Sequence, residues 1–202
     1  MLEHQFQRKG NKHHHFLLDG VYSFKEFDKR IQKLSKEVYK LKPIYQTSWP
    51  HEKIMGDCFE WFGEAFIKIL GADNRIGLVE YHPIAANDDF GADGKAIGMN
   101  GLPAGIQFKY KTNHTSFVMN NDDHIGNFTH YSYKKLGVPL TTSNLDSNLT
   151  IITTGNGLNP KVHEDMPIAN CRCIAWNHLL GMLENNNIFW DAFRNLVFTN
   201  PK

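Results

Sequence analysis

Residues 93–109 constrain the fold most, because they have the pattern of two short strands joined by a turn rich in Gly and Pro. Asp93 stands at the start of the first strand, and the second strand carries Gln107 and Lys109. Side chains alternate along a strand, so Gln107 and Lys109 share one face while Phe108 points to the other. An acid, an amide and a lysine on one sheet face can hold a divalent metal beside an ammonium group. This pattern favours phosphodiester hydrolysis by a metal-activated water.

A helix is expected before these strands, between Gly56 and Gly71. Its apolar residues recur at helical spacing, and Gly71 ends the pattern; they are Phe59, Phe62, Phe66 and Ile69. Glu60 and Glu64 are four residues apart and therefore share one polar face of this helix.

Three motifs in this order resemble the Mrr-like branch of the PD-(D/E)xK nucleases, over about residues 54–183. They are a Gly56…Phe59-Glu60 helix, a Gly/Asp-rich segment over 88–94 that ends in Asp93, and Gln107-Phe-Lys109. The resemblance implies a restriction-endonuclease-like α/β core with a mixed central sheet flanked by helices. We place this nuclease domain at 51–202, after an N-terminal helical extension over 1–50.

The resemblance also implies roles for individual residues. Asp93 is the expected central metal ligand, and Gln107 stands where the family more often has Glu. Lys109 would orient the attacking water and stabilise negative charge in the transition state. Further expected metal ligands are the backbone carbonyl of Phe108 and the carboxylate of Glu60, with Asp88, Asp89 and Glu64 as secondary candidates. The expected DNA contacts are Lys95, Tyr110 and Lys111.

These roles predict a Mg²⁺-dependent deoxyribonuclease, in which Mn²⁺ would substitute. Its substrate would be double-stranded DNA, and a homodimer would supply the two sites that a double-strand cut needs. The family covers restriction, homing and helicase-associated enzymes as well as junction resolvases, and fold does not choose among them. The alternatives are a catalytically inactive DNA-binding or assembly module on the same fold, and an RNA-directed nuclease.

Each motif residue also has a structural interpretation. The two glutamates could form an exposed helix face, the aspartates at 88 and 89 a solvated turn, and Lys109 an edge-strand lysine. A second histidine-based site would use His114, His124, Asn127 and His130, which resemble a His-Me nuclease finger. The spacing from Asn127 to His130 is too short for that unit, and the leading Asp-His pair is missing.

Composition limits the classes of partner. The formal net charge is only +1, so any DNA-binding surface must be a local patch. No apolar run has the length of a membrane span, and no signal peptide is evident. Three cysteines suit a reducing cytoplasm better than a secreted disulfide framework. Cys171 and Cys173 are expected to be buried as small hydrophobic side chains.

The clearest helix covers residues 23–42. Ser23 and Glu26 form a capping box, and the apolar stripe favours packing within the chain over a dimer seam. Its lysine-rich polar face is expected to be solvated, with phosphate contact as the alternative.

Residues 1–15 are expected to be a frayed terminus. We further expect a linker over 43–53, strands over 76–82, 149–154 and 171–175, helices over 124–136, 160–165 and 177–183, and a C-terminal helix that packs through Phe189, Trp190, Phe193, Leu196 and Val197.

Overall fold

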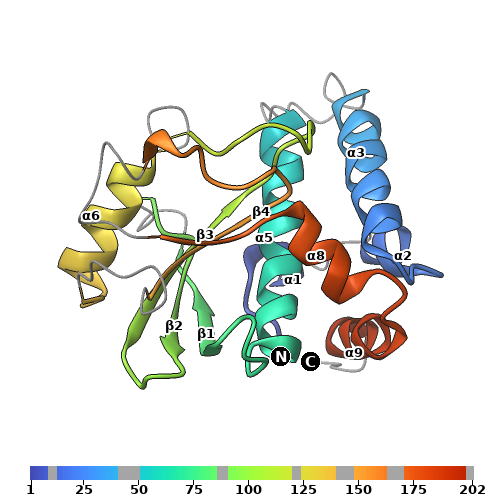
Figure 1. Cartoon of the computed structure of the whole chain (residues 1–202). Helices are drawn as coiled ribbons and strands as arrows, with labels where there is room; N and C mark the ends of the chain where they lie inside the picture. The colour runs from blue at the N-terminus through green and yellow to red at the C-terminus, as the bar shows by residue number, and fades with distance from the viewer. Residues whose placement is uncertain are drawn as a thin grey trace.

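A five-stranded mixed sheet lies at the centre of the molecule (Figure 1). The computed structural model describes residues 1–8, 13–40, 51–85, 91–119, 124–139, 148–162 and 171–198. The strands lie in chain order: β1 (Leu78–Pro83), β2 (Gly94–Gly98), β3 (Pro103–Lys109), β4 (Leu149–Thr153) and β5 (Arg172–Ile174). The first three pair antiparallel, and β3, β4 and β5 pair parallel.

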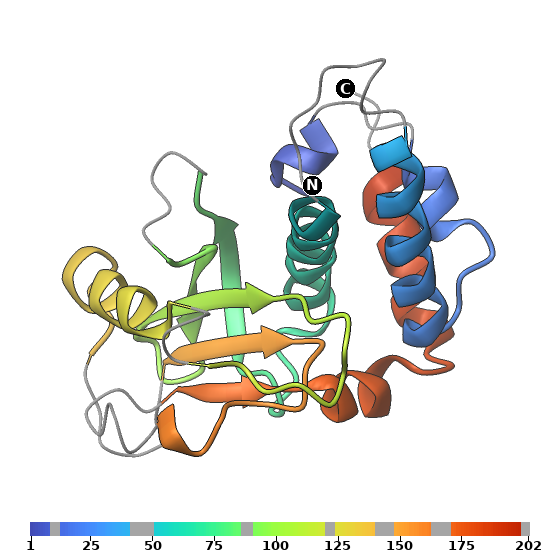
Figure 2. The same ribbon diagram turned by 90° about the horizontal axis from the view of Figure 1, so that it is seen from above.

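Helices cover both faces of this sheet, which confirms the α/β prediction. They are α1 (Gln5–Arg8), α2 (His13–Leu18), α3 (Phe24–Lys40), α5 (His51–Leu70), α6 (Ile125–Lys135), α8 (Trp176–Leu183) and α9 (Asn187–Phe198). Figure 2 shows α6 on one side of the sheet and α5 on the other, with α3 and α9 beyond α5. The parallel crossover from β3 to β4 passes through α6, as a parallel connection requires.

Most boundaries lie within two residues of their predictions. The exception is α5, which begins at His51, so the predicted linker over 43–53 is wrong for its last three residues. Lys161 and Val162 are helical, within the short helix predicted over 160–165, and residues 163–165 lie outside the described residues. Within the part of the chain that the structure describes, no helix combines the length and hydropathy of a membrane span.

The two faces of β3 differ, as the alternation predicts. Phe108 points towards α5, where its ring packs edge-on against Phe59 and leaves no room for a Cβ at Gly63. On the opposite face, the space beside Gly105 is filled by Ser132 of α6. Gln107 has the same parity as Gly105, so its side chain lies on the α6 face.

The main hydrophobic core lies on the α5 side of the sheet. Phe62 of α5 stacks or packs against aromatic rings from α3 and α9, among them Phe27 and Trp190. The stripe of α3 is therefore buried within the chain, as predicted. Ser23 Oγ accepts the backbone N–H of Glu26 at 3.2 Å, while the Glu26 carboxylate accepts from Arg30 instead of closing the capping box. The predicted domain boundary at residue 50 lies outside the described residues, and the helices on either side of it share this core.

The N-terminal residues pack against α5, so the prediction of a frayed terminus is wrong for those described. Leu2 is buried, and His14 stacks on Trp61 with ring centroids 4.8 Å apart. Glu64 is fully buried, and its two carboxylate oxygens accept the backbone N–H groups of Glu3 at 2.5 Å and His4 at 2.7 Å. A buried carboxylate with these donors fixes the start of the chain to the helix.

Candidate active site

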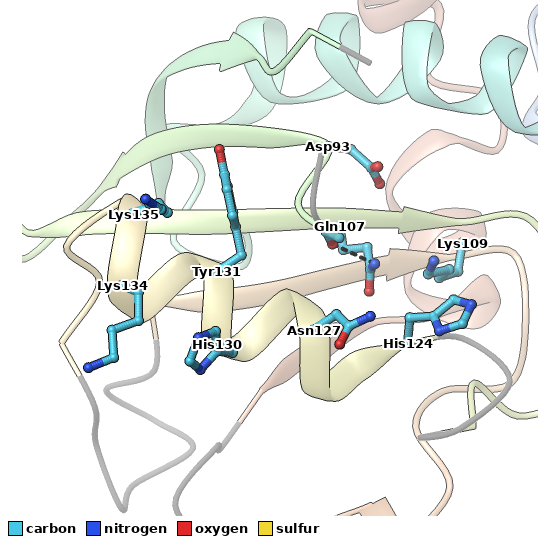
Figure 3. Close-up of a pocket in the computed structure, with 10 residues that line it drawn as sticks. Asp93, Gln107, Lys109, His124, Asn127, His130, Tyr131, Lys134 and Lys135 are labelled. Carbon is cyan, nitrogen blue, oxygen red and sulfur yellow. Dashed lines mark hydrogen bonds between the residues drawn. The ribbon is translucent and has the colours of Figure 1, made fainter. Parts of the chain in front are cut away.

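An open pocket of about 710 Å³ lies between the sheet and α6 (Figure 3). The sheet contributes Asp93, Gln107 and Lys109, so the structure brings three of the predicted site residues together. The facing wall comes from α6 and the residue before it: His124, Asn127, His130, Tyr131, Lys134 and Lys135. The pocket lies on the face of β3 that the alternation assigned to Gln107 and Lys109.

Asp93 is held by the backbone of the neighbouring strand. Its N–H donates to the carbonyl of Ile106 at 2.9 Å, which continues the pairing of β2 with β3. Its carboxylate Oδ2 accepts the N–H of Phe108 at 2.5 Å. This contact fixes the acid beside the Gln-x-Lys segment.

Gln107 is almost fully buried, with 1% of its surface exposed. Its Nε2 donates to the carbonyl of Gly91 at 2.6 Å, which sets the orientation of the amide. Its Oε1 is buried and has no hydrogen-bond partner among the described residues. An unsatisfied buried carbonyl oxygen costs about 1–3 kcal/mol, so this oxygen is suited to receive a donor or a cation.

The backbone carbonyl of Phe108 lies on the same side of β3 as Asp93. The carbonyl of Ile106 accepts from Asp93 N, whereas that of Lys109 accepts from Thr154 N beside β4. Successive carbonyls along a strand point to opposite sides, so the Phe108 carbonyl points to the β2 side, as the Ile106 carbonyl does. At this position β2 has not yet begun, because its first residue is Gly94. The donor set therefore consists of a carboxylate, an amide oxygen and a backbone carbonyl, which are hard ligands that suit Mg²⁺ or Mn²⁺.

Positive charge lies along the pocket, beside this donor set at Lys109 and at the far end of α6. Lys109, Lys134 and Lys135 line the pocket, and no ion pair joins them to an acid within the described part of the chain. Lys95 is exposed and pairs with Gly105 in the sheet, so it lies on the same face of the sheet as Gln107. A near-neutral protein thus has a local basic surface at the pocket, as phosphate binding requires.

The structure does not bring Glu60 and Glu64 to this pocket, because α5 lies on the other face of the sheet. Glu64 is bound to the N-terminal backbone and to Lys68 at 2.9 Å, so the exposed-face interpretation is wrong for this residue. Glu60 Oε2 accepts from His4 Nε2 at 3.1 Å. His4 Nδ1 accepts from Phe6 N, and burial lowers the pKa of His4, which agrees with a neutral ring that donates to Glu60.

Two other predicted groups also lie away from the pocket. Tyr110 donates its hydroxyl to Asp28 Oδ1 at 2.6 Å and packs against Phe59, on the α5 side. Lys111 is partly buried, and its backbone is joined to Thr154 by two hydrogen bonds. The secondary candidates at 88 and 89 lie outside the described residues.

Residues of α6 form a wall that the nuclease motifs do not include. The sequence grouped His124, Asn127 and His130 with His114, but His114 stacks on Trp176 away from the pocket, with ring centroids 3.6 Å apart. The other three line the pocket together. Their spacing of three residues was the sequence signal for one polar helix face, and Lys134 extends it by one turn.

Comparisons with protein-family models, with curated proteins and with solved structures find no match to this chain. The resemblance to PD-(D/E)xK nucleases therefore rests on its motifs. Among the described residues, no group of three or more His, Cys, Asp or Glu side chains is arranged to hold a metal. A cation at this pocket would therefore depend on the Gln107 and Phe108 oxygens in addition to Asp93.

Proposed function

We propose that this chain is a Mg²⁺-dependent DNA endonuclease on a restriction-endonuclease-like core, with its active site in the pocket between β3 and α6. The observation that carries the proposal is the buried Oε1 of Gln107, which has no hydrogen-bond partner among the described residues and belongs to a side chain that lines the pocket with Asp93 and Lys109. A fold without a ligand at this point gains nothing from a buried acceptor with no donor. A homodimer would supply the second site for a double-strand cut.

The chemistry divides between a bound cation and the groups of the chain. When bound, a divalent cation supplies Lewis-acid polarisation and lowers the pKa of water. Asp93, Gln107 and the Phe108 carbonyl would hold it, and the contact between Phe108 N and Asp93 keeps the carboxylate in place. Lys109 would neutralise the charge that develops on the phosphoryl oxygens. Loss of such a contact typically lowers the rate by about 10²–10³-fold.

The test compares cleavage of supercoiled plasmid and of a branched duplex, with Mg²⁺ or EDTA, by wild type and by Asp93→Asn and Lys109→Ala. Asn at 93 retains an acceptor for Phe108 N, so the variant should fold. Lys33→Ala, an exposed lysine on α3, serves as the matched control. We expect Mg²⁺-dependent cleavage that both site variants lose and the control retains. Calorimetric titration with Mn²⁺ should show binding to wild type and weaker binding to Asp93→Asn.

A catalytically inactive DNA-binding module is the second candidate. The observation that favours it is the charge of the donor set, because Asp93 is the single acid among the described residues that line the pocket. One carboxylate offsets only half the charge of a divalent cation. This candidate predicts DNA binding that is equal in Mg²⁺ and EDTA, no cleavage of either substrate, and no heat of Mn²⁺ binding.

A further inference from the structure

We infer that α6 is a track for one strand of the nucleic acid, which leads away from the active centre towards Lys134. This inference rests on the proposed function for the position of the reacting phosphate, and it adds the path that the rest of the strand follows. It is carried by the arrangement of side chains along the pocket, which the nuclease motifs do not explain.

The pocket-lining residues are ordered along the helix. Figure 3 shows His124 near Lys109 at one end, Asn127 beside Gln107, His130 further along, and Lys134 and Lys135 at the other end. The four side chains that follow one stripe of the helix are all exposed: His124, Asn127, His130 and Lys134. The opposite face of α6 is buried through Ile125, Phe128, Thr129 and Ser132.

Every member of this stripe can donate a hydrogen bond to a phosphate oxygen. His124 precedes the helix in a left-handed conformation, and its side chain makes no capping hydrogen bond, so the imidazole is not used to close the helix. Lys134 brings a full charge, and its Nζ lies 5.0 Å from the ring centroid of Tyr133. The stripe therefore has hydrogen-bond donors near the active centre and the ammonium group of Lys134 at the far end.

The length of the stripe sets the number of phosphates that it can contact. From His124 to Lys134 the helix rises about 15 Å, at 1.5 Å per residue. A duplex strand advances about 3.4 Å per nucleotide along the axis and also winds around it, so a straight stripe of this length contacts only a few consecutive phosphates. The pocket is open to solvent, so a duplex that lies across it would present one of its two backbones to the stripe.

The test measures DNA binding in EDTA, where cleavage does not interfere. Fluorescence anisotropy of a labelled duplex over a range of NaCl concentrations gives the slope of log affinity against log salt. We expect Lys134→Gln to reduce the magnitude of this slope by about 0.9, the value for one lost phosphate contact on duplex DNA. Asn127→Ala should weaken binding without changing the slope. Lys33→Gln on α3 is the matched control and should leave both quantities unchanged.

A second readout uses cleavage in Mg²⁺. Lys134→Gln should raise KM and preserve kcat, because a contact with a distant phosphate is the same in the ground and transition states. The track is overturned if folded Lys134→Gln keeps the wild-type slope of log affinity against log salt. It is also overturned if Lys33→Gln reduces that slope by the same amount. Binding that meets these expectations without any cleavage by wild type supports the track and rejects the nuclease, so the two failures are distinguishable.

Discussion

The backbone N–H of Phe108 donates to the carboxylate of Asp93 at 2.5 Å, so the strand that carries the Gln-x-Lys motif also positions its acid. The same residue inserts its ring between β3 and α5 on the other face of the sheet. Packing of the core and placement of the acid therefore depend on one residue. Substitutions in the core that move Phe108 are therefore expected to displace the Asp93 carboxylate, even where the substituted residue does not contact the pocket.

Gln107→Glu should make folding sensitive to divalent cations. The substitution places a carboxylate oxygen where Nε2 now donates to the carbonyl of Gly91, and the two oxygens repel each other. Without metal we expect a loss of about 1–3 kcal/mol in the free energy of unfolding. Thermal melts should show that Mg²⁺ restores more stability to this variant than it adds to wild type. Gln107→Leu is the control, and an equal Mg²⁺ response in all three proteins would argue against a cation at this position.

Two glycines of α5 should respond in opposite directions to alanine. A Cβ at Gly63 would overlap the ring of Phe108, so Gly63→Ala should destabilise the fold by about 1–3 kcal/mol. Gly56 lies in the same helix with open space around it, so Gly56→Ala should stabilise by up to about 1 kcal/mol. Urea unfolding of both variants measures the difference. Similar values for the two would show that helix propensity alone governs both positions.

Glu64→Ala should be strongly destabilising. The substitution leaves the N–H groups of Glu3 and His4 without their acceptor. It also removes an ion-pair partner of Lys68. Burial alone would lower the pKa of Lys68, and the carboxylates of Glu64 and Glu3 together raise it. Leaving a buried donor without an acceptor typically costs about 1–3 kcal/mol, and two N–H groups lose their acceptor here. Denaturant unfolding should show this loss, with a smaller one for Glu64→Gln, which keeps an acceptor. If Glu60→Ala, on the partly exposed neighbour, cost as much, burial would not be the cause.

Acid should weaken the fold through His14. Burial lowers the pKa of His14 to about 4, whereas in the unfolded chain it titrates near 6.5. The unfolded state therefore binds the proton first, and stability falls as the pH drops from 6.5 towards 4. His14→Phe keeps a ring on Trp61 and should gain about 1–3 kcal/mol over wild type at pH 4 relative to pH 7.5. Unfolding curves at both pH values measure this difference, and parallel pH profiles would contradict the assignment.

Local patterns in the sequence predicted the elements well. Apolar periodicity located α3, α5 and α9, and turn residues placed the ends of the strands, because these signals act over a few residues. The face of β3 that carries Gln107 and Lys109 followed from alternation alone. The donor set around Asp93 was expected from the motifs, and the pocket brings its sheet residues together.

Contacts between distant residues were not predictable in this way. Residues 1–15 are polar and rich in histidine, and Glu64, about sixty positions away, accepts the backbone N–H groups of Glu3 and His4 at their start. The prediction that Glu60 belongs to the site is wrong for the same reason, because its position depends on how α5 packs, and α5 lies on the face of the sheet opposite the pocket. The wall formed by α6 depends on the crossover between β3 and β4, which brings Asn127 opposite Gln107.

The hairpin of β2 and β3 has a consequence for how the site is assembled. Asp93 and Phe108 are separated by 15 positions, so their contact closes a short loop. Contacts of this kind form early and quickly during folding, while contacts between remote segments form late. We therefore expect the acid and the Gln-x-Lys segment to meet within one local hairpin, whereas the α6 side of the pocket needs the longer crossover that follows β3.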